Sequence, residues 1–167
     1  QYPEEAFGFA KTGQTIVDVT DARIVRLFVD GEPLDLRQVE IESYERALDM
    51  REGMLTRELI WTTPSGKRAR LRSRRLVSFV RRHLALLEYE ITILDAPATV
   101  DVRSVTRVPS GHQEDSDDPR KTRSLGEGVL EPVAHAGDGL RAVLCHRTPH
   151  SGMQLACGVD HRFETDC

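Results

Sequence analysis

The sequence is poor in aromatic residues and contains no long apolar run. Aromatic side chains make up 5% of the 167 residues, with a single tryptophan. The longest apolar runs, such as Leu84–Leu87, are far too short to cross a bilayer. The chain also opens without the basic, apolar and small-residue series of a signal peptide. The sequence therefore gives no indication of secretion or of a membrane partner.

Cysteine is scarce and confined to the C-terminal part. The three cysteines, Cys145, Cys157 and Cys167, are too few and odd in number for a disulfide framework. Unpaired cysteines are typical of a reducing compartment. The sequence therefore predicts a cytoplasmic location.

The overall charge is low, but it is unevenly distributed. The formal net charge is −4 and the pI is near 5.9, so no global field attracts nucleic acid. Between Lys67 and Arg82 there are eight basic residues and no acid. This stretch is interpreted as a solvated strand face, a face docked on another domain or subunit, or the partner of the acidic strand Glu40–Glu45. The alternative is an anion-binding interaction module.

Period-two patterns dominate the chain, and no segment longer than two turns has helical periodicity. Along Arg68–Arg74 small or apolar residues alternate with arginine, which indicates a strand with two different faces. Pro64-Ser65-Gly66 is a typical hairpin loop before it. The expected strands are Thr15–Val19, Arg23–Val29, Val39–Tyr44, Met54–Thr63, Lys67–Ser73, Leu84–Leu94, Thr99–Val105, Leu140–His146 and Met153–Val159. Such short strands with turns between them predict an all-β fold, an antiparallel β-sandwich with few or no helices.

One stretch, Val108–Glu127, is long, polar and almost free of apolar residues. Loops of this length inside a compact domain are usually either functional or mobile. We expect it to be a pocket-rim or subunit-contact loop.

Several stretches occur in an order that resembles a known family. In the main one, Arg46 precedes Leu48-Asp49, and Gly53 is followed by an apolar residue and a strand. The stretches are Asp30–Leu36, Tyr44–Glu58, Trp61 with the Gly66 turn, Arg75–Phe79 and Arg82–Ala85. Together they resemble the N-terminal domain of glycoside hydrolase family 65, which contains maltose, trehalose and kojibiose phosphorylases and related hydrolases.

The resemblance implies a division of labour between domains. Residues 1–167 would form a single, supersandwich-like N-terminal β-sandwich domain, and an (α/α)6 barrel elsewhere in the protein would hold the catalytic Glu and the phosphate or water site. The chain itself would then have no catalytic residue, metal or cofactor, and inorganic phosphate would be a co-substrate of a parent phosphorylase. The partners implied are the protein's own catalytic barrel, an α-linked disaccharide bound there, and a second subunit in a homodimer.

Four residues are candidates for interdomain or substrate-loop contacts. Arg46, Asp49 and Arg51 come before the tight turn expected at Gly53, where a local salt bridge would explain them equally well. Trp61 has a face suited to stacking on a sugar ring, although a lone Trp on a strand is more often part of the core. An exposed Trp61 would support a second hypothesis, a stand-alone carbohydrate-binding module.

Two further groups of residues are candidate sites. Glycoside cleavage uses paired carboxylates, and Glu40 with Glu42 and Glu88 with Glu90 are the obvious pairs, which we expect to be solvated. Cysteines and histidines gather near the end of the chain, at Cys145, His146, His150, Cys157 and His161. Their spacing lacks the paired knuckles of structural zinc, so no metal is predicted.

Overall fold

The computed structural model describes residues 2–3, 12–13, 17–108 and 129–166, and these form strands and connections without a helix. The expected all-β, antiparallel fold is therefore confirmed. None of the described residues form a helix long and apolar enough to span a membrane. Most of the stretch Val108–Glu127, and Cys167, lie outside the described residues.

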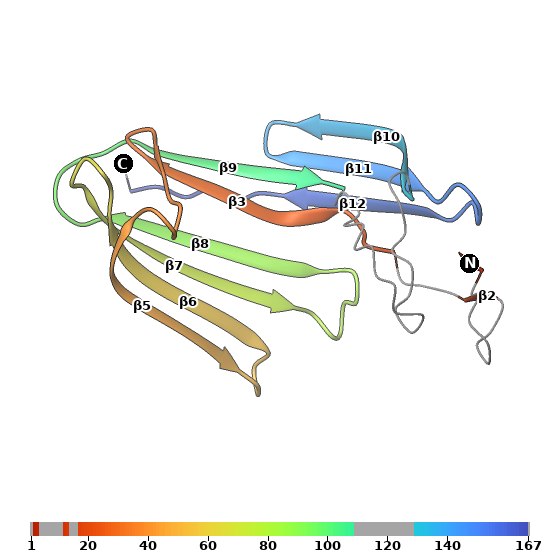
Figure 1. Ribbon diagram of the computed structural model, residues 1–167, viewed down its shortest axis with the longest axis horizontal. Coiled ribbons are helices and arrows are strands. Elements are labelled where there is room, and N and C mark those ends of the chain that lie inside the picture. Colours follow the sequence, from red (N-terminus) through yellow and green to blue (C-terminus); the bar gives the residue numbers. More distant parts are fainter. Residues whose placement is uncertain (1, 4–11, 14–16, 109–128, 167) are drawn as a thin grey trace. The chain divides into compact units, whose positions relative to one another are not determined.

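The chain divides into two compact units, residues 25–105 and residues 1–24 with 106–167. The prediction that 1–167 is a single domain stays a prediction. Twelve strands are described (Figure 1). They are β1 (Tyr2–Pro3), β2 (Thr12–Gly13), β3 (Asp21–Val29), β4 (Glu32–Pro33), β5 (Glu40–Asp49), β6 (Met54–Thr62), β7 (Arg68–Val77), β8 (Ala85–Ile93), β9 (Val100–Arg107), β10 (Glu131–Asp138), β11 (Arg141–Arg147) and β12 (Gln154–Asp160).

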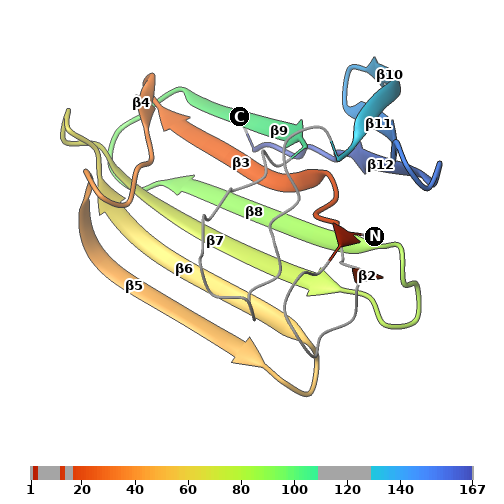
Figure 2. The ribbon, with the colours of Figure 1, turned by 45° about the vertical axis from the view of Figure 1, so that its right-hand side comes forward.

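The first unit is built on a four-stranded antiparallel sheet in the order β5-β6-β7-β8 (Figures 1 and 2). Its middle hairpin confirms the turn expected around Pro64–Gly66, where the Thr63 N–H donates to the Lys67 carbonyl at 2.8 Å. Gly66 has a φ of +87°, a conformation that glycine adopts without steric cost.

A second sheet, in the order β4-β3-β9, packs on the four-stranded one. Asp30-Gly31 makes the turn between β3 and β4, and both residues have positive φ, as expected from their position after a strand. Asp30 also fastens this turn to the start of β9, since the Thr99 N–H donates to its Oδ1 at 2.8 Å.

The hydrophobic core lies between these two sheets. Leu27 and Val29 from β3 meet Leu59 and Trp61 from β6, with Ala69 and Leu71 of β7 completing the cluster. Because side chains alternate along a strand, Leu59 and Trp61 of β6 and Ala69 and Leu71 of β7 all point to this core. The sandwich architecture is thus set by the period-two pattern of the central hairpin.

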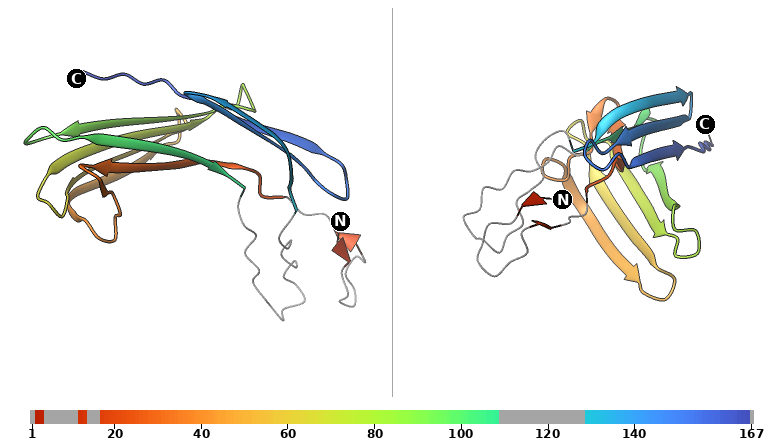
Figure 3. Two further views of the ribbon diagram at one scale, coloured as in Figure 1. Left: turned by 90° about the horizontal axis from the view of Figure 1, so that it is seen from above. Right: turned by 90° about the vertical axis from the view of Figure 1, so that its right-hand side faces the viewer.

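The second unit contains the three-stranded antiparallel sheet β10-β11-β12, whose strands run side by side in Figure 3. The expected hairpin near Thr148–Gly152 joins β11 and β12, while β10 was not foreseen in the sequence. The strand expected at Thr15–Val19 is not formed in its described part, because Val17–Val19 are unpaired chain.

One side-chain assignment on β5 is wrong. Strict alternation along the expected strand Val39–Tyr44 would place Tyr44 on the face of Glu40 and Glu42, but the register shifts between Ile41 and Ser43. A β-bulge adds one residue and so exchanges the two faces beyond it. Tyr44 consequently lies opposite Leu59, on the core-facing side.

Candidate functional site

The outer face of the four-stranded sheet carries a lattice of ion pairs. Arg68 on β7 reaches across β6 to Glu42 on β5, with Nε to Oε1 at 2.8 Å and Nη2 to Oε2 at 2.7 Å. Thr62, on the intervening strand, donates to the same Glu42 Oε1 at 3.0 Å. The predicted pairing of the basic stretch with the acidic strand is confirmed for this residue.

The lattice continues towards β8. Arg74 forms an ion pair with Glu88, and an Arg70 Nη2 lies 3.9 Å from a Glu90 carboxylate oxygen. The register sets Arg74 directly opposite Glu88, whereas Arg70, which is opposite Thr92, reaches Glu90 diagonally. Three outward arginines of β7, namely Arg68, Arg70 and Arg74, are therefore paired with acids of β5 and β8, which favours a solvated lattice over an anion-binding stripe.

In this arrangement the two carboxylate pairs are poorly suited to catalyse glycoside cleavage. A general acid needs a raised pKa to stay protonated near neutral pH. The hydrogen bonds from Arg68 instead lower the pKa of Glu42 to about 2. Glu40, Glu88 and Glu90 are exposed on the same face. The expectation that these carboxylates are solvated agrees with their placement.

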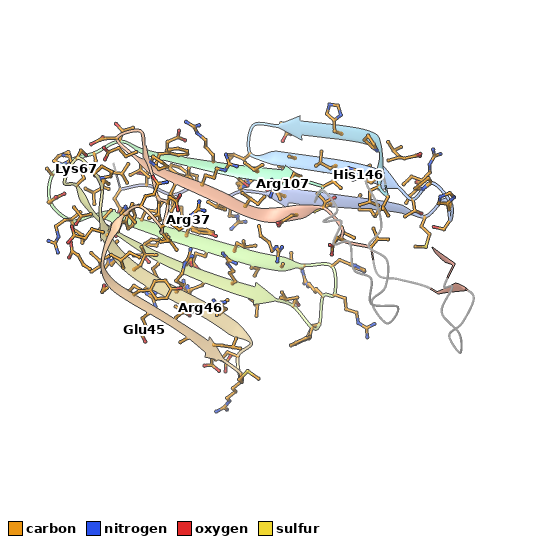
Figure 4. The ribbon with its side chains drawn as sticks, in the orientation of Figure 1. Arg37, Glu45, Arg46, Lys67, Arg107 and His146 are labelled. Atoms are coloured by element: carbon orange, nitrogen blue, oxygen red, sulfur yellow. The ribbon has the colours of Figure 1, made fainter. Side chains whose placement is uncertain are left out.

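The inner face of the same sheet is different, since arginines stand there without acids. Arg46 and Arg57 are direct cross-strand partners, and Arg57 is also opposite Ser73. Arg75 lies in the next row, opposite Leu55, with its Nη2 donating to the Tyr89 hydroxyl at 3.2 Å. Glu45 and Arg46, both labelled in Figure 4, are consecutive on β5 and so belong to opposite faces.

The turn between β5 and β6 holds two of the residues singled out in the sequence. Asp49 Oδ1 accepts hydrogen bonds from the N–H groups of Arg51 (2.9 Å) and Glu52 (3.0 Å). Gly53 closes the turn with a φ of +66°. Asp49 therefore has a local role in the hairpin, while an interdomain role of Arg46, Asp49 and Arg51 stays a prediction.

Trp61 lies in the core rather than at the surface. Only 1% of its surface is exposed, and it packs with Leu59 and Leu71. A sugar ring has no access to its faces in this arrangement. The structure thus gives no support to Trp61 as a substrate contact, and it removes the exposed tryptophan that a carbohydrate-binding module would need.

A surface hollow lies in the connection between β7 and β8, lined by Val80, Arg81, Arg82, His83 and Leu84. No carboxylate is among its lining residues, so the hollow has no acid–base pair. Its neighbour Phe79 is 89% exposed. This connection is a basic and apolar surface segment.

The cysteine and histidine residues near the end of the chain do not converge. Cys157 is opposite Leu144 and Cys145 is opposite Ala156, so the two thiols lie on opposite faces of their sheet. His146 is buried, with its Nδ1 3.5 Å from the Thr20 hydroxyl. Within the described residues, no group of three potential metal ligands is found.

Sequence reasoning missed Arg57 and Arg75 as members of one charged face. The signal was available for Arg57, because it precedes the core residues Leu59 and Trp61 by two and four positions on one strand. The signal was available for Arg75 as well, because alternation along β7 places it on the inward face with Leu71 and Ser73.

Comparison with known proteins identifies relatives over the whole chain. The family model described as "Glycosyl hydrolase family 65, N-terminal domain" matches residues 1–167. An uncharacterized glycosyl hydrolase of Mycobacterium leprae is 40% identical over 163 residues, which cover 98% of this chain and 20% of that protein. An alpha,alpha-trehalose phosphorylase of Thermoanaerobacter brockii is 36% identical over 167 residues, covering 99% of this chain and 21% of that protein.

The fold is found in a solved structure as well. A protein described as a candidate kojibiose phosphorylase from the human microbiome superposes with a TM-score of 0.67 at 18% identity, over 90% of this chain and 18% of that one. The chain spans about a fifth of the length of the curated relatives named above. Because this family model matches residues 1–167, the chain belongs to glycosyl hydrolase family 65 and corresponds to the N-terminal domain of that family.

Proposed function

We propose that these residues are a non-catalytic part of an enzyme that cleaves an α-linked disaccharide by phosphorolysis or hydrolysis. The family match over residues 1–167 is the observation that carries the proposal. It is supported by relatives named trehalose phosphorylase and, over 74% of this chain, kojibiose phosphorylase. The parent would act on maltose, trehalose or kojibiose.

The chemistry of the parent would take place outside these residues. A carboxylic acid of the (α/α)6 barrel would protonate the leaving glycosidic oxygen, and phosphate or water would attack the anomeric carbon from the opposite face, with inversion. The lowered pKa of Glu42 supports this division, because an ionised carboxylate held by Arg68 cannot donate that proton at neutral pH.

The contribution of the chain would be architectural. The sandwich core and the ion-pair lattice of the four-stranded sheet make a rigid scaffold, and we assign it dimer contacts and, through the stretch Val108–Glu127, a pocket-rim loop. A cytoplasmic location fits the free thiols of Cys145 and Cys157, which face away from each other.

The test is a substrate panel with the full-length protein. Maltose, trehalose and kojibiose are each incubated with and without inorganic phosphate, and the anomer of the released sugar phosphate or glucose is read by NMR. The proposal predicts turnover of at least one of these sugars with inverted configuration. Phosphate dependence assigns a phosphorylase, and its absence a hydrolase.

A retained configuration, or no turnover of any α-linked disaccharide, contradicts the proposal. A β-linked disaccharide such as cellobiose is the matched control, since the same assay detects its products. The protein is expected to leave it intact.

A further inference from the structure

The inner face of the sheet β5–β8 carries three arginines and no acid. By the register, Arg46, Arg57 and Ser73 form one row, and Leu48, Leu55 and Arg75 lie in the next. The residues of this face are Ile41, Tyr44, Arg46, Leu48, Leu55, Arg57, Leu59, Trp61, Ala69, Leu71, Ser73, Arg75, Val77, Ala85, Leu87, Tyr89, Ile91 and Ile93. We call the set Arg46, Arg57 and Arg75 the inner arginine cluster.

The first two members of the cluster are placed unfavourably as the chain stands. Directly opposed residues of an antiparallel pair have Cβ atoms only about 5 Å apart, and like charges there are destabilising. Among the described residues, no carboxylate forms an ion pair with Arg46 or Arg57. Two arginines paired across neighbouring strands therefore favour binding of an anion from elsewhere.

The burial of Arg57 also favours binding of an anion at this face. Its Nε is buried and has no hydrogen-bond partner. A buried donor without an acceptor has lost its hydrogen bond to water without replacement, and the cost is larger when the group is charged. The Arg57 Nε–H therefore lacks an acceptor at the border of the core, and we expect a hydrogen-bond acceptor to approach this face.

The surroundings indicate a polypeptide rather than a small ion. Tyr44 is 49% exposed and Leu48 58% exposed, on either side of Arg46 along β5. Val77, at the end of the same face, is 64% exposed. A hydrated phosphate would neutralise the arginines but leave these apolar side chains in water. A chain segment with apolar and acidic residues would cover both.

We propose that the inner arginine cluster binds aspartate or glutamate side chains of a segment of the full-length protein outside residues 1–167. The inference rests on the proposed function to the extent that the chain is part of a longer enzyme, about four fifths of which lies elsewhere in the relatives. Carboxylates accept charge-assisted hydrogen bonds from guanidinium groups, often two at once. The contact fixes the sheet to the rest of the protein.

Carbodiimide cross-linking of the full-length protein tests this contact. The substitution Arg46→Lys keeps the positive charge and supplies an amine, which a carbodiimide joins to a neighbouring carboxylate as an amide. The expected product links position 46 to an Asp or Glu outside residues 1–167, identified by peptide mass spectrometry. Arg75→Lys probes the next row in the same way, should Arg46→Lys fail to fold.

Arg72→Lys is the matched control, because it changes an arginine on the outer face of the same sheet, opposite Glu58 and Glu90. Its cross-links are expected to stay within the sheet. The proposal is overturned if position 46 links only to carboxylates within residues 1–167, links only to a second copy in a mixture of light and isotope-labelled protein, or gives no product. None of these readouts depends on turnover, so they are independent of the substrate panel.

Discussion

Arg68 and Glu42 form a two-pronged ion pair although their strands are not neighbours. The pair spans β6, with distances of 2.7 and 2.8 Å between guanidinium nitrogens and carboxylate oxygens. Glu42 is itself the extra residue of the β-bulge, because the pairing register shifts between Ile41 and Ser43. The bulge thus both turns Tyr44 inward and leaves Glu42 on the outer face.

Replacing Glu42 by glutamine should reduce stability in a pH-dependent way. The folded-state pKa of Glu42 is about 2, below its ordinary 4.5, so the ionised form is favoured by folding. Its contribution is complete above about pH 4.5 and is lost as the pH falls through 2. Thermal unfolding at pH 7, 5, 4 and 3 should show the wild-type advantage over Glu42→Gln shrinking only below pH 4.5. An advantage independent of pH would contradict the ion pair.

Two substitutions at Asp49 separate a turn role from an ionic one. Asparagine keeps the Oδ1 acceptor for the Arg51 and Glu52 N–H groups, whereas alanine removes it. Asp49→Ala should lower the free energy of unfolding by about 1 kcal/mol, and Asp49→Asn should leave it nearly unchanged. Denaturant titration measures both. Equal losses in the two variants would show that the charge matters, as an interdomain contact requires.

Removing the indole of Trp61 should damage the core. Trp61 is 1% exposed, and Trp→Ala at such sites costs about 3–5 kcal/mol. Phe79→Ala is the control, because that ring is 89% exposed and its loss should cost less than about 0.5 kcal/mol. Unfolding midpoints of the two variants give the comparison. A Trp61→Ala protein of normal stability would contradict the assignment of Trp61 to the core.

The thiol of Cys157 should be slow to alkylate. Burial, followed by the negative charge of Asp21, raises its pKa above the ordinary 9.0, so little thiolate is present at pH 8. Iodoacetamide labelling followed by peptide mass spectrometry should give a lower rate at Cys157 in the folded protein than in urea. Equal rates in the two conditions would show that the site is open to solvent.

The alternation of polar and apolar residues predicted most of the strands, because a half-buried strand must repeat every two residues. It could not locate the bulge after Ile41, since no residue type in the sequence marks the position of the bulge. The bulge nevertheless exchanges the two faces of the strand beyond it. The alternation places Arg74 and Arg75 on opposite faces, but it does not show which acids lie opposite them. Which of these meets an acid depends on pairing with β8, and sequence distance does not reveal that register.

The candidate sites were harder to predict than the fold. Trp61 and Asp49 belong to types that serve both structure and function, and only burial and hydrogen bonding distinguish the two roles. Arg57 escaped notice because an isolated arginine in a strand is ordinary. Its buried Nε and the facing Arg46 are properties of the folded sheet.

The central claim is that these residues belong to a sugar-cleaving enzyme but do not catalyse its reaction. The most direct measurement compares residues 1–167 alone with the full-length protein on maltose, trehalose and kojibiose, with phosphate and without. The account predicts cleavage by the full-length protein and none by residues 1–167. Cleavage of any of these sugars by residues 1–167 alone would contradict it.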